Sequence, residues 1–299
     1  MDESFAERLD RETLRVLSER SDAKGLFRLA SHFAALAALA VLIAFIPFGP
    51  WLLPALAVYG VLLIFLFAPL HECIHRTAFR ARWLNDAVAP FAGTVLILPP
   101  GYFREFHFAH HRHTQDEAND PELLAEKPQS LAAYLWLMTG LPYWRERIST
   151  TLRHAFTGRI EETFIAERKR GAIRREAVLY VLFYAAVIAA SAAAGSSAIV
   201  WYWLAPALLG QPALRVFLLA EHGNCPRIPD MLKNSRTTTS NALVRWFAWN
   251  MPYHAEHHAY PGLPFHALAA AHTHLAPAID VRAKGYLAMH WGYLRWIGK

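Results

Sequence analysis

The sequence predicts an all-α integral membrane protein, with four transmembrane helices in two hairpins and a cytosolic helical cap that carries histidine boxes. Hydrophobic residues make up 55% of its 299 residues and charged residues only 18%, against about 45–50% and about 25% in soluble domains. The apolar residues are concentrated in four runs of about twenty residues, the length that a helix needs to cross a bilayer. Eight of the sixteen histidines fall in three short clusters outside these runs.

The first two runs predict a tight helical hairpin. They cover residues 29–48 and 51–70, and only Gly49 and Pro50 separate them. The second run contains no charged residue. Each run is about 30 Å long as a helix, which matches the hydrocarbon core.

The second pair of runs covers residues 177–195 and 197–220. Pro206 and Pro212 predict a kink in the fourth helix, because proline cannot complete the helical hydrogen bonding. Arg215 also lies in this run, so its guanidinium must reach an interface or a polar cavity.

The distribution of basic residues predicts the orientation of the chain in the membrane. Of the thirty Lys and Arg residues, six precede Leu29, fifteen lie between the two pairs and eight follow Glu221. The two short turns carry none. The positive-inside rule therefore places both termini in the cytoplasm, together with a cap formed by residues 71–176 and 221–299. We expect residues 1–299 to form one multi-pass domain, and the Ala/Arg-rich composition favours a prokaryotic inner membrane.

Other features exclude several classes of protein. Two cysteines, Cys73 and Cys225, cannot build a disulfide framework. The net charge of +6 suits anionic lipid headgroups, and no basic stretch lies on a recognisable nucleic-acid module. The apolar stretches 87–100 and 131–144 are too short to span, so we expect interfacial or re-entrant segments.

The three histidine clusters have the spacing of metal ligands on helices. Residues three or four apart share one helical face, so each cluster points two or three imidazoles in the same direction. Neutral imidazole binds iron, zinc, copper and nickel. Since one tetrahedral zinc needs only three or four protein ligands, eight histidines indicate a site for two metals. The clusters are His71 and His75, then His107, His110 and His111, then His254, His257 and His258.

The combination of HxxxH, HxxHH and HxxHH, with two predicted spans between the second and third boxes, resembles the membrane fatty acid desaturase and hydroxylase family. The segments 106–114, 119–122 and 250–266 are similar to the surroundings of that family's boxes. The resemblance covers roughly residues 51–274. It implies four transmembrane helices below a cytosolic cap and two iron ions (Fe2+/Fe3+) held by about nine histidines. The eight box histidines match ligand positions, and His222, just after the last span, takes the ninth.

The resemblance also suggests residues that support the ligands. Glu72 and Glu256 lie inside boxes, where carboxylates commonly orient ligand imidazoles or face the surface. The family often has an asparagine shortly before the late histidine, but here that stretch is 215–221, so Asn224 or Asn250 is the candidate substitute. We expect the acidic run, which comprises Asp116, Glu117, Asp120 and Glu122, to form a solvated turn. The remaining histidines (His32, His113, His154, His266, His272, His274 and His290) are expected to lie outside the ligand set.

The function that the resemblance implies is O2-dependent desaturation of a fatty acyl chain in a membrane lipid. The sequence contains no haem motif of the cytochrome b5 type and no iron–sulfur cysteines, so we expect a separate electron donor, such as ferredoxin or a cytochrome b5-like protein. A basic cap favours an acidic carrier.

Three alternatives remain open. The same scaffold suits a hydroxylase of an alkane, a sphingolipid or a carotenoid. His71-Glu72-Cys73-Ile74-His75 is also an HExxH motif, in which two histidines hold zinc and the glutamate is the general base of a metalloprotease. The third alternative is a membrane protein that binds metal without catalysis.

Overall fold

The computed structural model describes residues 9–298 and confirms the all-α membrane fold. Four helical segments are long and apolar enough to cross a membrane: Asp22–Phe45, Leu52–His75, Glu167–Ala193 and Val200–His222. The first begins seven residues before the predicted run, because Ser21 caps it by accepting a hydrogen bond from the Lys24 N–H.

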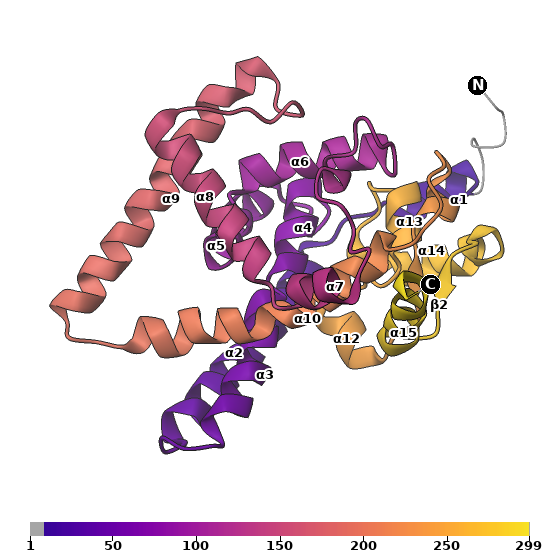
Figure 1. The fold of residues 1–299 in the computed structure, drawn as a ribbon. Helices are drawn as coiled ribbons and strands as arrows, with labels where there is room; N and C mark the ends of the chain where they lie inside the picture. Colours follow the sequence, from indigo (N-terminus) through magenta and orange to yellow (C-terminus); the bar gives the residue numbers. More distant parts are fainter. Residues whose placement is uncertain (1–8, 299) are drawn as a thin grey trace.

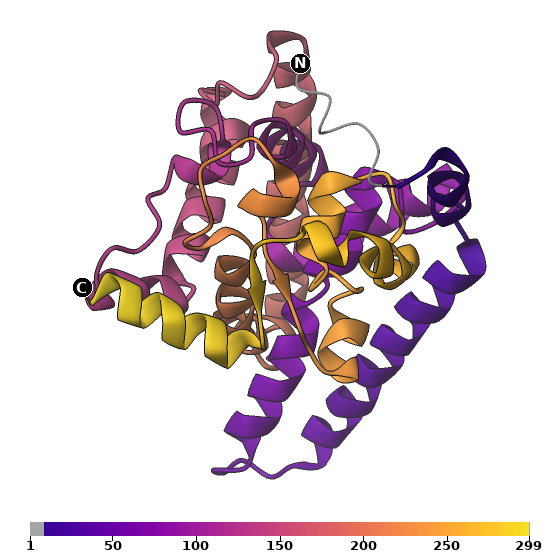
Figure 2. The ribbon, with the colours of Figure 1, turned by 90° about the vertical axis from the view of Figure 1, so that its right-hand side faces the viewer.

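The first two spans form the predicted hairpin, which projects from the rest of the molecule in both views (Figures 1 and 2). It consists of α2 (Asp22–Phe45) and then α3 (Leu52–Ile64), which continues into α4 (Phe67–His75). Arg76 has a left-handed backbone (φ 61°) and ends α4 directly after the first histidine cluster.

The other two spans follow one another closely in the chain but do not pack as a hairpin. From the turn at 194–199, α9 (Glu167–Ala193) and α10 (Ala205–His222) diverge (Figure 1). The helix α10 packs against α3, and α9 packs against the amphipathic helix α8 (Leu141–Thr157). A π-helical turn, Val200–Leu204, precedes α10, and α10 stays helical through Pro212.

Two glycines explain why α10 packs on α3. Gly60 and Gly210 face each other so closely that a Cβ at either position would collide with the opposite backbone. Small residues at such crossings let membrane helices approach, since lipid gives little hydrophobic driving force for their association. This crossing fixes the position of His222 at the end of α10 relative to α4.

The two short apolar stretches become helices that do not span. The first lies in α5 (Arg82–Leu96), which ends at Ile97 (φ 51°) before two prolines. The second begins as α7 (Leu131–Met138) and turns at Gly140 (φ 72°) into α8.

The remaining elements include the two helices that carry the second and third histidine clusters. The described chain also contains α1 (Arg11–Leu17), α6 (Pro100–His113), η2 (Pro121–Leu123), α11 (Met231–Asn234), α12 (Ala242–Phe247), α13 (His254–Ala259), η4 (Phe265–Ala267), α14 (Leu268–Leu275), η5 (Ala276–Ala278) and α15 (Tyr286–Ile297). Two short parallel strands of two residues each, β1 (Thr237–Thr238) and β2 (Arg282–Ala283), pair in the C-terminal part of the chain.

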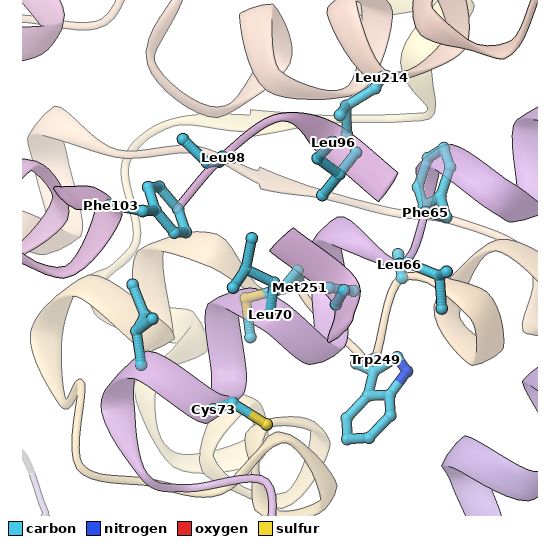
Figure 3. Packing of buried hydrophobic residues seen from close by; sticks show 14 of the residues in the cluster. Phe65, Leu66, Leu70, Cys73, Leu96, Leu98, Phe103, Leu214, Trp249 and Met251 are labelled. Atoms are coloured by element: carbon cyan, nitrogen blue, oxygen red, sulfur yellow. The ribbon is translucent and has the colours of Figure 1, made fainter. Parts of the chain in front are cut away.

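The main apolar cluster, part of which Figure 3 shows, includes residues that neighbour the histidine clusters. Leu70 is fully buried and immediately precedes His71. The ring of Phe103 lies 5.4 Å from that of His107, so the apolar packing directly supports a box histidine. Residues of α4, α5, α6 and α10 contribute to the cluster, together with Trp249 and Met251, which precede α13.

Candidate metal centre

The structure brings all nine predicted ligand histidines together, although they come from four separate elements. The helix α4 supplies His71 and His75, α6 supplies His107, His110 and His111, the end of α10 supplies His222, and α13 supplies His254, His257 and His258. Glu176 of α9 fixes the start of α6 by accepting hydrogen bonds from the N–H groups of Gly101 (2.9 Å) and Tyr102 (3.2 Å).

Five of the imidazoles form one group. Their ligand nitrogens lie within 4.8 Å of one another. Nε2 of His111 is 2.9 Å from Nε2 of His107 and 3.0 Å from Nε2 of His257. We call this set the five-histidine group; it comprises His71, His75, His107, His111 and His257.

The other four imidazoles form a second group around His222, which we call the four-histidine group. Nε2 of His222 faces Nε2 of His254 at 2.8 Å, of His110 at 3.1 Å and of His258 at 3.2 Å. A neutral imidazole has one N–H donor, so these four nitrogens cannot satisfy one another by hydrogen bonding. A shared cation satisfies all of the converging lone pairs.

The pKa values agree with a metal site. Burial and the neighbouring imidazoles hold the pKa of His107, His111, His254, His257 and His258 well below the usual value of 6.5. These rings are therefore neutral at physiological pH, which is the form that binds metal. Burial opposes protonation of His110 as well, but Glu122 and Asp120 outweigh it and raise its pKa.

The four-histidine group is oriented through the Nδ1 side of its rings. Nδ1 of His110 donates to the Asp120 carboxylate at 2.8 Å. Nδ1 of His258 lies 3.2 Å from the Thr114 hydroxyl, which itself donates to the His110 carbonyl at 2.7 Å. Such contacts fix the tautomer and leave Nε2 free for a metal.

The other two members of this group have weaker partners. Nδ1 of His222 is 3.4 Å from the carbonyl of the fully buried Asn234. Nδ1 of His254 lies 3.3 Å from the Glu221 carboxylate, within ion-pair distance but without hydrogen-bond alignment. Each ring of the four-histidine group thus faces a polar group on its outer side.

The five-histidine group lacks this support. In residues 9–298, Nδ1 of His71, His111 and His257 and Nε2 of His75 are buried without a hydrogen-bond partner. Apolar packing and the backbone of the helices hold these rings instead. The two groups therefore differ in their outer contacts as well as in ligand number.

The two glutamates that were candidates for orienting ligand imidazoles contact groups other than the ligands. Glu72 accepts hydrogen bonds from the Thr77 hydroxyl at 2.7 Å and from the Phe265 N–H at 3.2 Å. Glu256 bonds to the Thr237 hydroxyl at 2.5 Å and to His272. Both are fully buried, so they join segments of the chain rather than facing the surface or orienting a ligand imidazole.

The two predicted asparagines also lie apart from the rings. Asn224 is exposed in a left-handed turn (φ 54°). Asn250 donates its amide to the Phe265 carbonyl at 3.0 Å. The asparagine that contacts a ligand histidine is Asn234, through its backbone carbonyl. Its position after a loop gives no local sequence signal.

The expectation of a solvated acidic turn is wrong for Asp120. Its side chain is 2% exposed because it accepts from His110 and from the backbone N–H groups of Gln115 and Glu122. The remainder of the run is more open, and Asp116 and Glu117 are exposed. His272, which is expected outside the ligand set, bonds to Glu256. The other histidines outside the boxes have separate surroundings; His154, for example, lies 3.0 Å from Glu162.

The chain is similar to several known proteins. Residues 48–293 match the family model described as fatty acid desaturase. The sn-1 oleoyl-lipid 12-desaturase of Picosynechococcus sp. is 26% identical over 252 residues, which are 77% of this chain and 71% of that protein. The protein of the same name from Synechocystis sp. is 28% identical over 270 residues, 82% of this chain and 75% of its own. The dihydrorhizobitoxine desaturase of Bradyrhizobium elkanii is 29% identical over 241 residues, 75% of this chain and 66% of its own.

Proposed function

The chain belongs to the fatty acid desaturase family and is an oxidoreductase, and from this premise we propose that it uses two iron ions, O2 and external electrons to desaturate a fatty acyl chain of a membrane lipid. The observation that carries the proposal is the convergence of nine neutral or neutralisable imidazoles from four elements into two adjoining groups. Imidazole donors suit iron.

In this proposal each group holds one iron ion. The five-histidine group would bind one through His71, His75, His107, His111 and His257, and the four-histidine group would bind the other through His110, His222, His254 and His258. When bound, the iron pair supplies the activation of O2 that removes hydrogen from an unactivated carbon.

The protein's own contribution is placement and exclusion of water. Nearly all ligand rings are buried, and Leu70 and Phe103 bring the apolar cluster up to the rings of α4 and α6. An apolar chain that packs against this cluster would present a methylene to the metals in a dry setting. Such fixed orientation accelerates a reaction by removing the entropic cost of bringing the reactants together.

The number of histidines argues against the zinc protease. One zinc would leave most of the nine histidines without a role. One oxygen of the Glu72 carboxylate accepts hydrogen bonds from Thr77 and from the Phe265 backbone, which fixes the side chain between two segments, and the other oxygen is buried without a partner in the described chain.

The same proposal includes the orientation of the chain in the membrane and the source of the electrons. The excess of Lys and Arg outside the spans supports a cytoplasmic location of both termini and of the histidine-bearing face. A separate acidic carrier, such as ferredoxin or a cytochrome b5-like protein, would supply the electrons, and the cyanobacterial relatives favour a prokaryotic membrane.

The test is reconstitution of purified, iron-loaded protein with a reductase, ferredoxin and phospholipid vesicles. We expect reductant-dependent O2 uptake and a lipid product that has lost two hydrogens. His110→Ala and His257→Ala, one from each group, should abolish product while the protein still inserts into membranes. A product that gains one oxygen would identify a hydroxylase, and metal binding without O2 uptake would identify a storage protein.

A further inference from the structure

Arg215 is a cation without a counter-ion in the membrane-spanning helix α10. Within residues 9–298 its guanidinium makes no ion pair and no hydrogen bond, and its Nε is buried without a partner. Its one specific contact is with Tyr143, whose ring centre lies 4.6 Å from the guanidinium carbon.

That contact does not offset the cost of the charge. A cation–π contact contributes less than the desolvation cost of a buried ion that has no paired charge. Ionisable residues inside membrane spans for this reason commonly mark a pathway or a binding site. Among the described residues the carboxylates of Glu122 and Glu146 act on Arg215 only from beyond ion-pair distance, so a bound anion would supply the direct partner that the guanidinium lacks.

Gln211 provides a second, independent sign of a missing ligand. Its side chain is fully buried, and neither its amide nitrogen nor its amide oxygen has a hydrogen-bond partner. Gly140 holds the side chain in place, because its left-handed turn (φ 72°) brings the backbone so close that a Cβ there would collide with Gln211. A buried polar group without a hydrogen-bond partner destabilises the fold, so a ligand that bonds to it is favoured.

A second buried guanidinium, that of Arg147, lies near Arg215. Arg147 contacts Tyr102 and the neighbouring Glu146. Burial raises the pKa of Tyr143 to about 12, while Arg215 and Arg147 both act in the opposite direction. Tyr143 donates its hydroxyl to the Leu96 carbonyl at 2.7 Å, so its own hydrogen bond is already made.

Helical geometry relates this pair to the metal centre. At 3.6 residues per turn, Gln211 and Arg215 point within about 20° of His222, so all three share one face of α10. Arg215 precedes His222 by seven residues, which corresponds to about 10 Å along the axis. Leu214, between Gln211 and His222, belongs to the main apolar cluster (Figure 3).

We propose that Arg215 and Gln211 bind an oxyanion, a carboxylate or a phosphate, on the apolar substrate that reaches the metal centre. The guanidinium supplies charge and paired donors, the amide of Gln211 adds a donor, and the apolar cluster takes the chain. That the bound molecule is the substrate rests on the proposed function, whereas anion binding itself does not depend on turnover.

The test is ligand-induced thermal stabilisation of the purified protein in a neutral detergent. The probes are octanoate, octyl phosphate and uncharged methyl octanoate. We expect at least one anion to raise the unfolding temperature more than methyl octanoate does. Octanoate alone would indicate a free carboxylate, and octyl phosphate would indicate a phospholipid headgroup.

Variants separate this site from general binding of amphiphiles. Arg215→Gln should remove most of the anion-specific shift, and Arg215→Lys should keep part of it. Gln211→Leu should weaken it without loss of charge. Arg295→Gln, the same change at an exposed arginine of α15, should leave it unchanged. Equal shifts with methyl octanoate, or an undiminished shift in both Arg215→Gln and Gln211→Leu, would overturn the proposal.

The result is independent of the proposed function. Iron content and O2 uptake are measured on the same samples. Anion binding that depends on Arg215 in a protein without O2 uptake would refute the desaturase proposal and leave the binding site intact. Desaturation with no anion-specific shift would support the desaturase proposal and refute the anion-binding site.

Discussion

The carboxylate of Asp120 lies 2.8 Å from Nδ1 of His110, and both side chains are only 2% exposed. This contact orients an imidazole whose Nε2 points to His222. Carboxylate partners of this kind raise the basicity of a ligand and typically change metal affinity by about 10–100-fold. The four-histidine group has this support. In the described chain, four of the five rings of the five-histidine group instead have a buried ring nitrogen without a hydrogen-bond partner.

Asp120→Asn should therefore weaken metal binding at one of the two positions. The amide keeps the size of the side chain but removes the charge. We expect about 10–100-fold weaker retention of one metal per chain, measured as metal content after graded chelator treatment. Asp116→Asn, an exposed carboxylate of the same loop, is the matched control and should keep both metals. Equal loss of both metals in Asp120→Asn would contradict the distinction between the groups.

Glu72→Gln should retain both metals and activity, because the amide oxygen can accept from Thr77 and Phe265 as the carboxylate does. Glu72→Ala leaves these buried donors unsatisfied and should cost about 1–3 kcal/mol of stability. Thermal unfolding and O2 uptake of the two variants provide the measurement. Loss of all activity in Glu72→Gln with stability unchanged would instead favour a general base.

Gly210→Ala should disturb the metal centre from a distance. The added methyl collides with the backbone at Gly60 and must move α10, which carries His222. We expect a loss of about 1–3 kcal/mol from overpacking and reduced metal content, read from thermal unfolding and elemental analysis. Gly292→Ala, which adds a methyl in open space, should be neutral. A stable Gly210→Ala protein with full metal content would show that the crossing is adaptable.

The metal-free protein should lose stability as the pH falls below 6.5. Five histidines have pKa values well below 6.5 in the folded state, so the unfolded chain binds protons first. Each such group lowers the unfolding free energy by at most about 1.4 kcal/mol per pH unit in this window. Thermal unfolding between pH 7.5 and 5.5 measures the slope. A flat profile would mean that these rings are not buried in the neutral form.

Local patterns predict much of the fold and of the histidine arrangement. The lengths of the apolar runs predict the four spans, and the three- and four-residue spacings place His107, His110 and His111 on one helical face. His222 could be selected through the family resemblance, because it follows directly after the last predicted span. The packing of α10 on α3 rather than on α9 depends on Gly60 and Gly210, which are 150 residues apart in the chain.

The outer contacts of the ligands could not be predicted in the same way. Asp120 meets His110 only because the loop after α6 folds back, whereas Asp116 and Glu117 of the same loop stay exposed. Glu256 is in a histidine box, but its carboxylate points to Thr237 and His272. Hydrogen bonds between segments depend on the tertiary arrangement, whereas motif spacing reports only the local helix.

Anomalous X-ray scattering at the iron edge, from crystals of iron-loaded protein, tests the central claim most directly. The account predicts two iron peaks in each molecule, one among the rings of the five-histidine group and one among those of the four-histidine group. A single peak, or a lone zinc held by His71 and His75 with the other imidazoles empty, would contradict it.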